Sequence, residues 1–552
     1  MMKNLLKTLW LAELLLALLI IFGIADATMS YISLFVLGLG ILKLSDLDAL
    51  RFYIYSIPIF VAMPENFLSS SMSVWRFALL IFLLKVAFER FDTPALVKDR
   101  KLTLAEKGNE LRQRVAGLIR DIKESNYRRL ALSVLAFFAI AAISLVFAQS
   151  LGAGIKQMIF LGSVFLLFGI VTWAVKTEKD VEDILRSVFV TGTGIMIVGF
   201  LQFLSTFFIT LSDFWGMWNE HIINAFYGEK MTALLSYSNT WFSYYDATGD
   251  IPPTLRMFSV MPDSHSFSML MILFMPLSLY HYFSVTRKSE KNKALVLLAL
   301  FLLAILFSGS RGAWVGWLGA LAAASYLWLY KKVPGKFRIF RMGDLEANRK
   351  IYKTVLRSVL LLILLIPVSM VSLNASQDAY LIREGRALDG SRNAFLHRTF
   401  SIGDMDETSN KGRLEIWKDS AESLAKHPVL GIGIGNFPYA LSEKIGASKM
   451  GSSAHNIYLH IAVEMGIVGL AAFLWILWNI LDKIFSLSQK LRQDKHRLLA
   501  ASFLVSFVWI LTYGVFDVVI VNDKVLTLIV ILLAVFYRME SIEGREMTAE
   551  KA

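Results

Sequence analysis

The sequence predicts an all-α bundle of helices that cross a lipid bilayer, and three observations support this prediction. The 552 residues are 56% hydrophobic and only 18% charged, which is more apolar surface than a soluble core of ordinary domains can bury. Apolar runs of about 17 to 25 residues recur along the chain, and a helix of that length spans the roughly 30 Å hydrocarbon layer of a membrane. Short alternating segments typical of an outer-membrane barrel are not found.

The apolar runs predict about 14 membrane-spanning helices. By residue number they are expected at 5–24, 28–44, 51–63, 73–88, 130–148, 157–175, 187–212, 267–285, 293–309, 312–330, 357–373, 456–485, 498–516 and 525–538. No repeat of fixed period and no low-complexity tract divides the chain. Residues 1–552 are therefore expected to form a single integral membrane domain.

The first apolar run allows two interpretations. Lys3 and Lys7 precede residues 8–24, and the small residues at 25–27 resemble a signal-peptide cleavage site. The run is long for a signal peptide and contains Glu13, which favours an uncleaved first helix. The topology of the later spans is the same in either case.

Basic residues in the connecting loops predict the orientation of the bundle. The chain has a net charge of +12, and its lysines and arginines cluster in the loops 89–129, 287–293, 331–357 and 490–497. Threading the chain through the spans puts all four loops on one side, as expected for the cytoplasmic side of a membrane. Within the first loop, residues 102–122 are expected to form an amphipathic helix on the inner surface. This distribution does not suggest nucleic-acid binding.

Two long connections are then expected to lie outside. Residues 213–266 are rich in tryptophan, tyrosine and phenylalanine, and residues 374–455 form the longest polar segment of the chain. Extended loops on a rigid scaffold are where functional sites usually lie. Because the chain has no cysteine, disulfides, thiolate metal sites and a cysteine nucleophile are all excluded.

Arg311 lies in the sequence Ser-Gly-Ser-Arg-Gly at 308–312, between two spans that both reach the outer surface there. An arginine at this depth needs an anion or a water-filled cavity, because leaving it in hydrocarbon costs several kcal/mol. The alternative is a side chain that extends outward to the interface. Gly309 and Gly312 allow a tight turn or a close backbone approach to a ligand.

Arg413 precedes an expected amphipathic helix that ends at His427-Pro428. Four residues are expected to share the packing face of this helix: Leu414, Trp417, Ala421 and Leu424. Near a helix N-terminus, a guanidinium can hold phosphate oxygens with two bonds. The alternative for Arg413 is a salt bridge to Glu415 or Asp419.

A glycine-rich segment follows at 431–436, Gly-Ile-Gly-Ile-Gly-Asn. It resembles a phosphate-binding loop only superficially, because the expected strand before it and helix after it are missing. We therefore expect no dinucleotide site in this segment.

His455 lies at the mouth of a later span on the outer side, with Asn456 beside it as a further candidate for substrate contact. A neutral imidazole at this position could take a proton from a sugar hydroxyl. The alternative is a histidine that only caps the helix by hydrogen bonding. His460 is wrongly spaced to form a metal pair with His455, and no carboxylate–histidine cluster occurs elsewhere, so no metal site is expected.

Arg256 precedes Asp263 and His265 at the end of the first outer loop. The latter two could orient a substrate or pair with Arg256, and alternatively Asp263 caps the next helix. The threading, which uses only apolar lengths and basic loops, places Arg256, Arg311, Arg413 and His455 on one side of the membrane. Three arginines suit a diphosphate, and one histidine suits a base.

Three segments carry a family resemblance. They read SRGAW at 310–314, GRLEIW at 412–417 followed by HPVLGIGIGNF at 427–437, and AHNIYLHIAVEMGIVGL at 454–470. Together they resemble the O-antigen ligase and polymerase family of bacterial envelope glycosyltransferases, over roughly residues 256–478. The resemblance implies a GT-C-like membrane fold whose large periplasmic loop closes over a cavity for undecaprenyl-diphosphate-linked glycan.

The resemblance also implies roles for individual residues. The family's essential arginines and histidine correspond to Arg311, Arg413 and His455, with Arg256 as a further arginine. His455 would be the general base on an acceptor hydroxyl, and the arginines would neutralise the leaving lipid diphosphate, with inversion and without metal, nucleotide or other cofactor. Where the family has a proline–asparagine pair this chain has Pro262-Asp263, which puts the role of Asp263 in doubt.

The sequence leaves the acceptor open. The protein could be a ligase that transfers glycan to lipid A-core, or a polymerase that joins repeat units of O-antigen or exopolysaccharide. A transporter or flippase of lipid-linked saccharide is an alternative of another class, although such proteins usually carry charged or broken helices near the bilayer midplane. A scaffolding protein would not need arginines and a histidine converging on one face.

Overall fold

The computed structural model describes residues 2–64, 73–91, 127–236, 241–243, 253–330, 345–386, 394–405, 408–441 and 453–551. Regular structure in these residues is helical apart from one short antiparallel pair, β1 (Phe242–Ser243) with β2 (Thr254–Leu255). The amphipathic helix expected at 102–122 lies outside the described residues. The predicted all-α membrane bundle is confirmed.

Fourteen helices of the described residues build the bundle, and further helices lie in the connections between them. The first eight long helices are α1 (Met2–Ile21), α2 (Ser30–Lys43), α3 (Asp46–Ser56), α4 (Val74–Phe91), α6 (Arg128–Ser144), α7 (Leu151–Ala174), α8 (Glu178–Ser205) and α12 (Ser264–Ser284). They are followed by α13 (Lys288–Phe307), α14 (Arg311–Leu329), α15 (Leu345–Arg383), α19 (Ile457–Lys490), α20 (Asp494–Tyr513) and α21 (Asp523–Lys551). Four short α-helices lie in the described parts of the connections: α9 (Leu211–Met217), α10 (Asn224–Tyr227), α11 (Glu229–Ser236) and α16 (Ala394–Phe400). The connection after α16 also holds α17 (Thr408–Lys426), which has 19 residues. A π-helical turn, η4 (Trp218–Ile223), joins α9 to α10, and 3₁₀ turns occur at Ala27–Met29, Ile57–Ile59, Leu145–Phe147, Phe437–Ala440 and Val519–Val521.

Each span expected from the sequence coincides with one of the long helices. Ten helices of the described residues are long and apolar enough to cross a membrane, whereas α2, α3, α4 and α13 do not meet that standard by themselves. The protein is thus a multi-pass membrane protein, and the number of about 14 crossings stays a prediction.

Several helices begin before, or end after, the apolar run that revealed them. Helix α8 begins at Glu178 instead of 187, because Thr177 and Asp180 form a capping box there. Helix α15 continues to Arg383, ten residues beyond its expected end at 373. An apolar run marks only the part of a helix that faces hydrocarbon, whereas backbone hydrogen bonding extends the helix into polar sequence.

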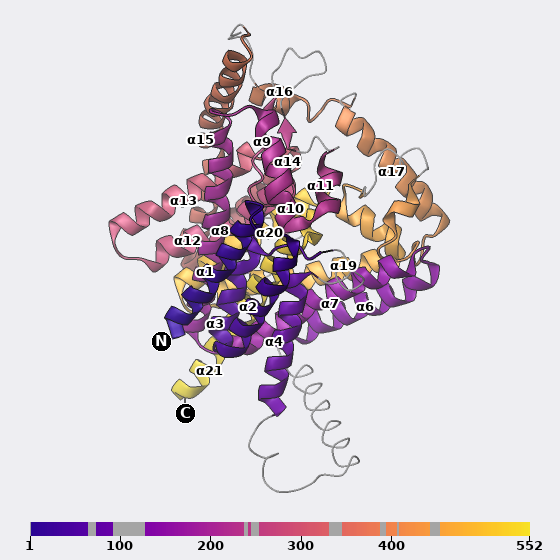
Figure 1. Cartoon of the computed structure of the whole chain (residues 1–552). Helices are drawn as coiled ribbons and strands as arrows, with labels where there is room; N and C mark the ends of the chain where they lie inside the picture. Colours follow the sequence, from indigo (N-terminus) through magenta and orange to yellow (C-terminus); the bar gives the residue numbers. More distant parts are fainter. Residues whose placement is uncertain are drawn as a thin grey trace.

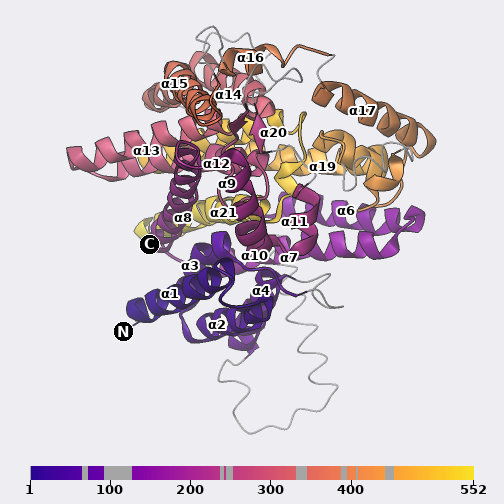
Figure 2. The same ribbon diagram turned by 45° about the horizontal axis from the view of Figure 1, so that its top comes forward.

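The centre of the bundle is formed by α12, α20 and α21. In the 18-residue apolar stretch of α12, 83% of the residues are buried, and in that of α20 the buried share is 78%. The corresponding share for α1 at the periphery is 17%. In both views α1 to α4 lie together on one side of the central helices, and α6 and α7 run with α19 along another flank (Figures 1 and 2). The apolar middle of the central helices is therefore enclosed by protein.

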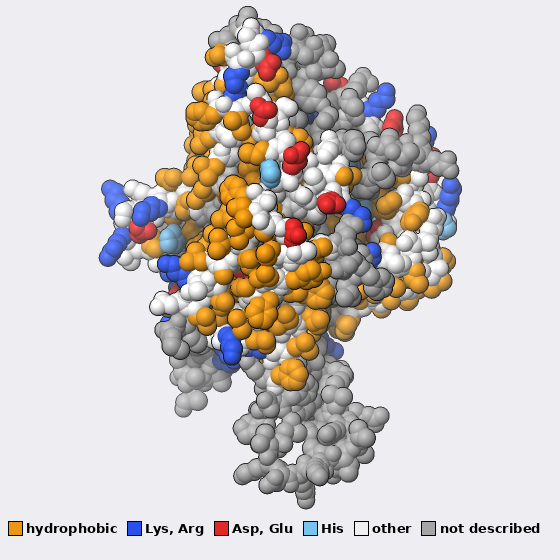
Figure 3. Space-filling model, in the orientation of Figure 1, with side chains coloured by type: hydrophobic (Ala, Val, Ile, Leu, Met, Phe, Trp, Pro, Cys, Tyr) orange, Lys and Arg blue, Asp and Glu red, His pale blue; other side chains and the backbone are white. Residues whose placement is uncertain are grey.

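The exterior is apolar over a broad area. Large side chains on the peripheral helices are exposed, among them Phe35 (68%), Leu15 (57%), Val190 (50%) and Leu201 (61%). Figure 3 shows hydrophobic side chains covering much of the middle of this face, with a few acidic side chains among them and lysine and arginine side chains mostly toward the edges. Such a surface is stable in a bilayer and unfavourable in water.

Helix α19 is broken at Gly466, whose backbone (φ 69°, ψ −174°) is not helical. The break exposes main-chain groups of α19, and the glycine-rich connection pairs with them. Ile432 and Gly433 donate amide hydrogen bonds to the carbonyls of Val463 and Glu464, and the amide of Ile467 donates to Pro428. The glycine-rich segment is therefore engaged in main-chain pairing with α19.

Replacing Gly466 by alanine is expected to destabilise this junction. A Cβ atom there would lie 2.0 Å from the carbonyl oxygen of Val429. This backbone conformation is essentially restricted to glycine, and holding alanine in it costs about 1–3 kcal/mol of stability. The measurement is the melting temperature of the detergent-solubilised protein, with Gly194→Ala as control because nothing lies within 4 Å of a Cβ at that helical position. A wild-type melting temperature for Gly466→Ala would contradict the assignment.

Candidate functional site

The turn between α13 and α14 organises one end of the bundle. Gly309 has a positive φ of 60°, which reverses the chain so that carbonyl groups of the turn face neighbouring segments. The Ser308 carbonyl accepts a hydrogen bond from Arg256 Nε at 3.0 Å. Ser310 caps α14, because its hydroxyl accepts from the Ala313 amide. Arg311, the first residue of α14, is only 6% exposed.

The long connection after α15 docks on this turn through a reciprocal pair of arginines. Arg311 Nη1 donates to the carbonyl and the hydroxyl of Ser401, at 2.9 and 3.1 Å. Arg398 in turn donates to the carbonyl of Gly309, from Nε at 3.4 Å and Nη2 at 3.5 Å. The connection thus places Arg398 close to Arg311, and both arginines lie at the N-terminal end of α14.

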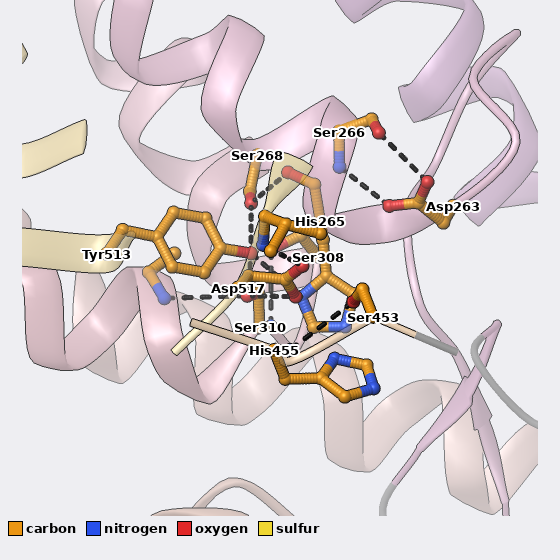
Figure 4. A network of polar contacts seen from close by, with 12 residues as sticks. Asp263, His265, Ser266, Ser268, Ser308, Ser310, Ser453, His455, Tyr513 and Asp517 are labelled. Carbon is orange, nitrogen blue, oxygen red and sulfur yellow. Dashed lines mark hydrogen bonds and ion pairs between the residues drawn. The ribbon is translucent and has the colours of Figure 1, made fainter. Parts of the chain in front are cut away.

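His265, in the first turn of α12, is the centre of the polar network (Figure 4). Its Nδ1 lies 2.7 Å from the Tyr513 hydroxyl, 3.1 Å from Ser310 Oγ and 3.2 Å from Asp517 Oδ2. Its Nε2 lies 3.3 Å from Nη2 of Arg256. A guanidinium only donates, so we assign Nε2 as the acceptor and place the proton of the neutral ring on Nδ1, facing Asp517.

Asp517 lies in the connection between α20 and α21 and is 5% exposed. Burial raises the pKa of its carboxyl above the ordinary value, while the positive charges of Arg413 and Arg256 and the amide of Val518 act in the opposite direction. Arg413 is the largest of these opposing influences, so α17 presents its arginine to the same carboxylate that contacts His265.

Helix α17 places Arg413 differently from the expected pattern. The helix begins at Thr408, so Arg413 is its sixth residue and lies beyond the first turn. The predicted packing face is wrong in part, because Leu414 is 45% exposed and Ala421 is exposed. The buried residue is Ile416, and the Trp417 indole donates to the Ala454 carbonyl at 2.8 Å. The helix therefore packs against the segment that carries His455, and Arg413 lies toward that side.

His455 lies beside this network and is partly exposed (Figure 4). Its backbone has a positive φ of 46°, an uncommon conformation for a residue other than glycine. Its amide donates to Ser453 Oγ at 3.3 Å, and the amide of Ile457, two residues further, donates to the Gly514 carbonyl at the end of α20. Figure 4 shows His455 next to His265 and Asp517, so the segment that carries His455 adjoins the polar network.

Asp263 and Asn456 cap the two helices that enter the site. The Asp263 carboxylate accepts from both the amide and the hydroxyl of Ser266, at 2.7 and 2.9 Å. Burial raises the pKa of Asp263, and the Ser266 amide opposes that shift. Asn456 Oδ1 accepts from the amides of Tyr458 and Leu459. These caps fix the directions of His265 and His455, which neighbour them in sequence.

The structure adds Asp517, Tyr513, Ser310 and Arg398 to the residues singled out from the sequence. One feature of the sequence could have pointed to Asp517, because the predicted topology puts the end of the span before it on the same side as the arginines. Arg398 has none, because it is one of many basic residues in a long connection. Among the described residues, no group of three or more His, Cys, Asp or Glu side chains is arranged to hold a metal ion.

Replacing Asp517 by asparagine is expected to raise the melting temperature at neutral pH. Because the folded-state pKa is raised, the ionised carboxylate costs stability above that pKa, and the cost disappears as the pH falls below the ordinary carboxyl value. The advantage of Asp517→Asn should thus be largest at neutral pH and shrink on acidification.

The control is Asp213→Asn, because Asp213 is an exposed carboxylate at the start of α9. This control should melt close to the wild-type temperature at both pH values. An Asp517→Asn variant that melts below wild type at neutral pH would show that the ion pair with His265 outweighs the cost of burial.

One comparison with known proteins concerns the part of the chain that carries most of these residues. A family model described as O-antigen ligase matches residues 296–474, a segment that includes Arg311, Arg398, Arg413 and His455. No curated protein matches the chain. The resemblance predicted from the sequence is confirmed by this match to the O-antigen ligase family over residues 296–474.

Proposed function

We propose that this protein is an inverting, metal-independent glycosyltransferase of the O-antigen ligase type. It moves glycan from an undecaprenyl-diphosphate-linked donor to an acceptor hydroxyl at the periplasmic face of the bacterial inner membrane. One observation carries the proposal: three arginines from separate segments converge on the turn between α13 and α14. Arg256 contacts His265 and the Ser308 carbonyl, Arg398 donates to the Gly309 carbonyl, and Arg311 donates to Ser401. His455 lies beside this cluster (Figure 4).

The arginines suit a diphosphate leaving group. Four guanidinium groups, from Arg256, Arg311, Arg398 and Arg413, face two carboxylates, Asp263 and Asp517, so cations outnumber anions in the site. A guanidinium binds phosphate oxygens through two parallel bonds and keeps its charge. Donors placed in advance where negative charge develops are commonly the largest contribution to catalysis. We infer that they take the role of a metal ion here.

His455 is the better candidate for the base. His265 has both ring nitrogens engaged, Nδ1 with Asp517 and Tyr513 and Nε2 with Arg256. We therefore assign His265 as a positioning residue that links the Asp517 carboxylate to the Arg256 guanidinium. His455 is partly exposed at the edge of the same site, where an acceptor hydroxyl can approach it.

The reaction is a single displacement. His455 takes the proton of the acceptor hydroxyl, and the resulting oxygen forms a bond to the anomeric carbon of the donor sugar from the face opposite the diphosphate. The bond between that carbon and the diphosphate oxygen breaks, and its electron pair leaves with the lipid diphosphate, next to the arginines. One displacement inverts the anomeric configuration.

The bundle supports a lipid-linked donor. The site is formed at the ends of α12, α14, α19 and α20, which belong to the ten membrane-span candidates, so it lies near the boundary of the apolar exterior. A polyprenyl chain can stay in the bilayer while its diphosphate reaches the arginines. The proposed acceptor is lipid A-core or a growing glycan.

The test is transfer of glycan from purified undecaprenyl-diphosphate donor by the detergent-solubilised protein in the presence of a chelator. We expect product with inverted anomeric configuration and release of lipid diphosphate. Product on lipid A-core identifies a ligase, whereas lengthened lipid-linked glycan identifies a polymerase. Loss of all activity on chelation contradicts the metal-free mechanism, and movement of donor across vesicles without any transfer contradicts the enzyme assignment.

A further inference from the structure

A polar cleft lies beside the proposed catalytic site, along the C-terminal half of α17. It has a volume of about 300 Å³, which is enough for a small ligand, and its surface is mainly polar. Asp419, Glu422, Ser423 and Lys426 line one side from α17. Tyr439 faces them from the 3₁₀ turn after the glycine-rich segment.

The position of the cleft connects it to the site. Asp419 and Lys426 follow Arg413 on the same helix by 6 and 13 residues. At about 1.5 Å per residue, they lie about 9 and 20 Å along the axis from Arg413. That separation suits sugar units that lie a few sugars away along the glycan from a reacting bond held at Arg413.

The lining selects for a neutral ligand rich in hydroxyl groups. Asp419 and Glu422 accept hydrogen bonds, Lys426 donates them, and Ser423 does both. The two carboxylates lie opposite no excess of positive charge, since the lining adds one lysine, His427 and the neutral Gln149, and an apolar ligand would find little surface to cover. Neighbouring hydroxyls of a sugar ring fit such alternating donors and acceptors, and the Tyr439 ring offers an apolar face for the C–H side of a pyranose.

The floor of the cleft is rigid. Ile432 lines the cleft, and the glycine-rich segment around it is held by main-chain hydrogen bonds to α19. Gly431, Gly433 and Gly435 all have positive φ, and a Cβ on any of them would come within 3.0 Å of neighbouring backbone. A prearranged binding surface loses less entropy when a ligand binds.

We propose that this cleft is a glycan subsite that holds sugar units of the lipid-linked saccharide away from the scissile bond. The inference rests on the proposed function and extends it, because it makes turnover depend on glycan length. It also gives the glycine-rich segment, which binds no nucleotide in this interpretation, a role as the floor of the subsite.

The experiment compares lipid-diphosphate donors that carry one repeat unit and several repeat units, for wild type, Glu422→Ala and Tyr439→Ala. Each variant should raise KM for the longer donor about tenfold, the loss of one charge-assisted hydrogen bond or ring contact, while the single-unit donor keeps the wild-type KM. The control is Glu415→Ala, an exposed carboxylate of α17 outside the cleft lining. Its KM should be unchanged for both donors.

A binding measurement separates this inference from the proposed function. Glycan freed from its lipid by mild acid is titrated into the protein, and contact is read by saturation-transfer NMR. Binding by wild type that is lost in Glu422→Ala supports the subsite even if no transfer is detected, in which case only the proposed function fails. Transfer that is unaffected by either variant at every donor length, or absence of glycan binding, overturns the subsite.

Discussion

Replacing His455 by asparagine is expected to slow glycan transfer about 10²- to 10⁴-fold, the usual contribution of a general base. Asparagine suits the test because it tolerates the left-handed backbone that His455 adopts and so leaves the segment intact. The variant should keep the wild-type melting temperature and donor binding, because Asp517, His265 and Arg256 contact one another directly.

The matched control is His221→Asn, an exposed histidine in the π-helical turn after α9. Its transfer rate should equal that of wild type. A His455→Asn variant that is folded and retains more than about a tenth of the wild-type rate would remove His455 from the role of base, given the range above. Attention would then move to Asp517, the carboxylate nearest to the arginines.

Replacing Arg413 by glutamine is expected to lower turnover about 10²- to 10³-fold, as the loss of one preorganised charge-stabilising group commonly does. The physical reason is its position: its charge acts on both Asp517 and His265, at the centre of the site. Arg413→Lys should recover part of the loss, because it keeps the charge but not the two-pronged geometry. Turnover is measured at saturating donor.

Lys418→Gln provides the control, because Lys418 is an exposed cation on the same helix. If Arg413→Gln only raised KM and left turnover unchanged, the arginine would bind ground state and transition state equally. That outcome would place Arg413 in donor binding and leave charge stabilisation to Arg311, Arg256 and Arg398.

The fold class was predictable from the sequence because the bilayer imposes a strong length requirement on apolar helices. Each expected span coincides with a helix, and the errors lie at the ends, as at α8 and α15. Those ends depend on caps and on packing above the hydrocarbon layer. The Thr177–Asp180 capping box is readable only once the helix is known to extend that far.

The site was predictable only in part. Arg311, Arg413 and His455 carry motif signals, and the loop bias places them on one side. The contact of His265 with Asp517 and Tyr513 joins residues about 250 positions apart, because α12 and α20 pack side by side at the centre of the bundle. No local pattern encodes that neighbourhood. The packing face of α17 was misjudged for a related reason: the helix packs on the His455 segment, and helical periodicity does not identify a partner.

The pairing at the α19 break makes the position of the glycine-rich segment independent of the side chains that line the cleft. The hydrogen bonds that attach residues 428–433 to α19 join main-chain groups, so they do not depend on the α17 side chains that line the cleft. Glu422 and Lys426 can therefore be exchanged while Gly466 keeps the connection in place. An exchange of the cleft-facing residues of α17 between relatives should change the glycan preference and leave the reaction unchanged. These positions are therefore the place to engineer the protein toward another polysaccharide.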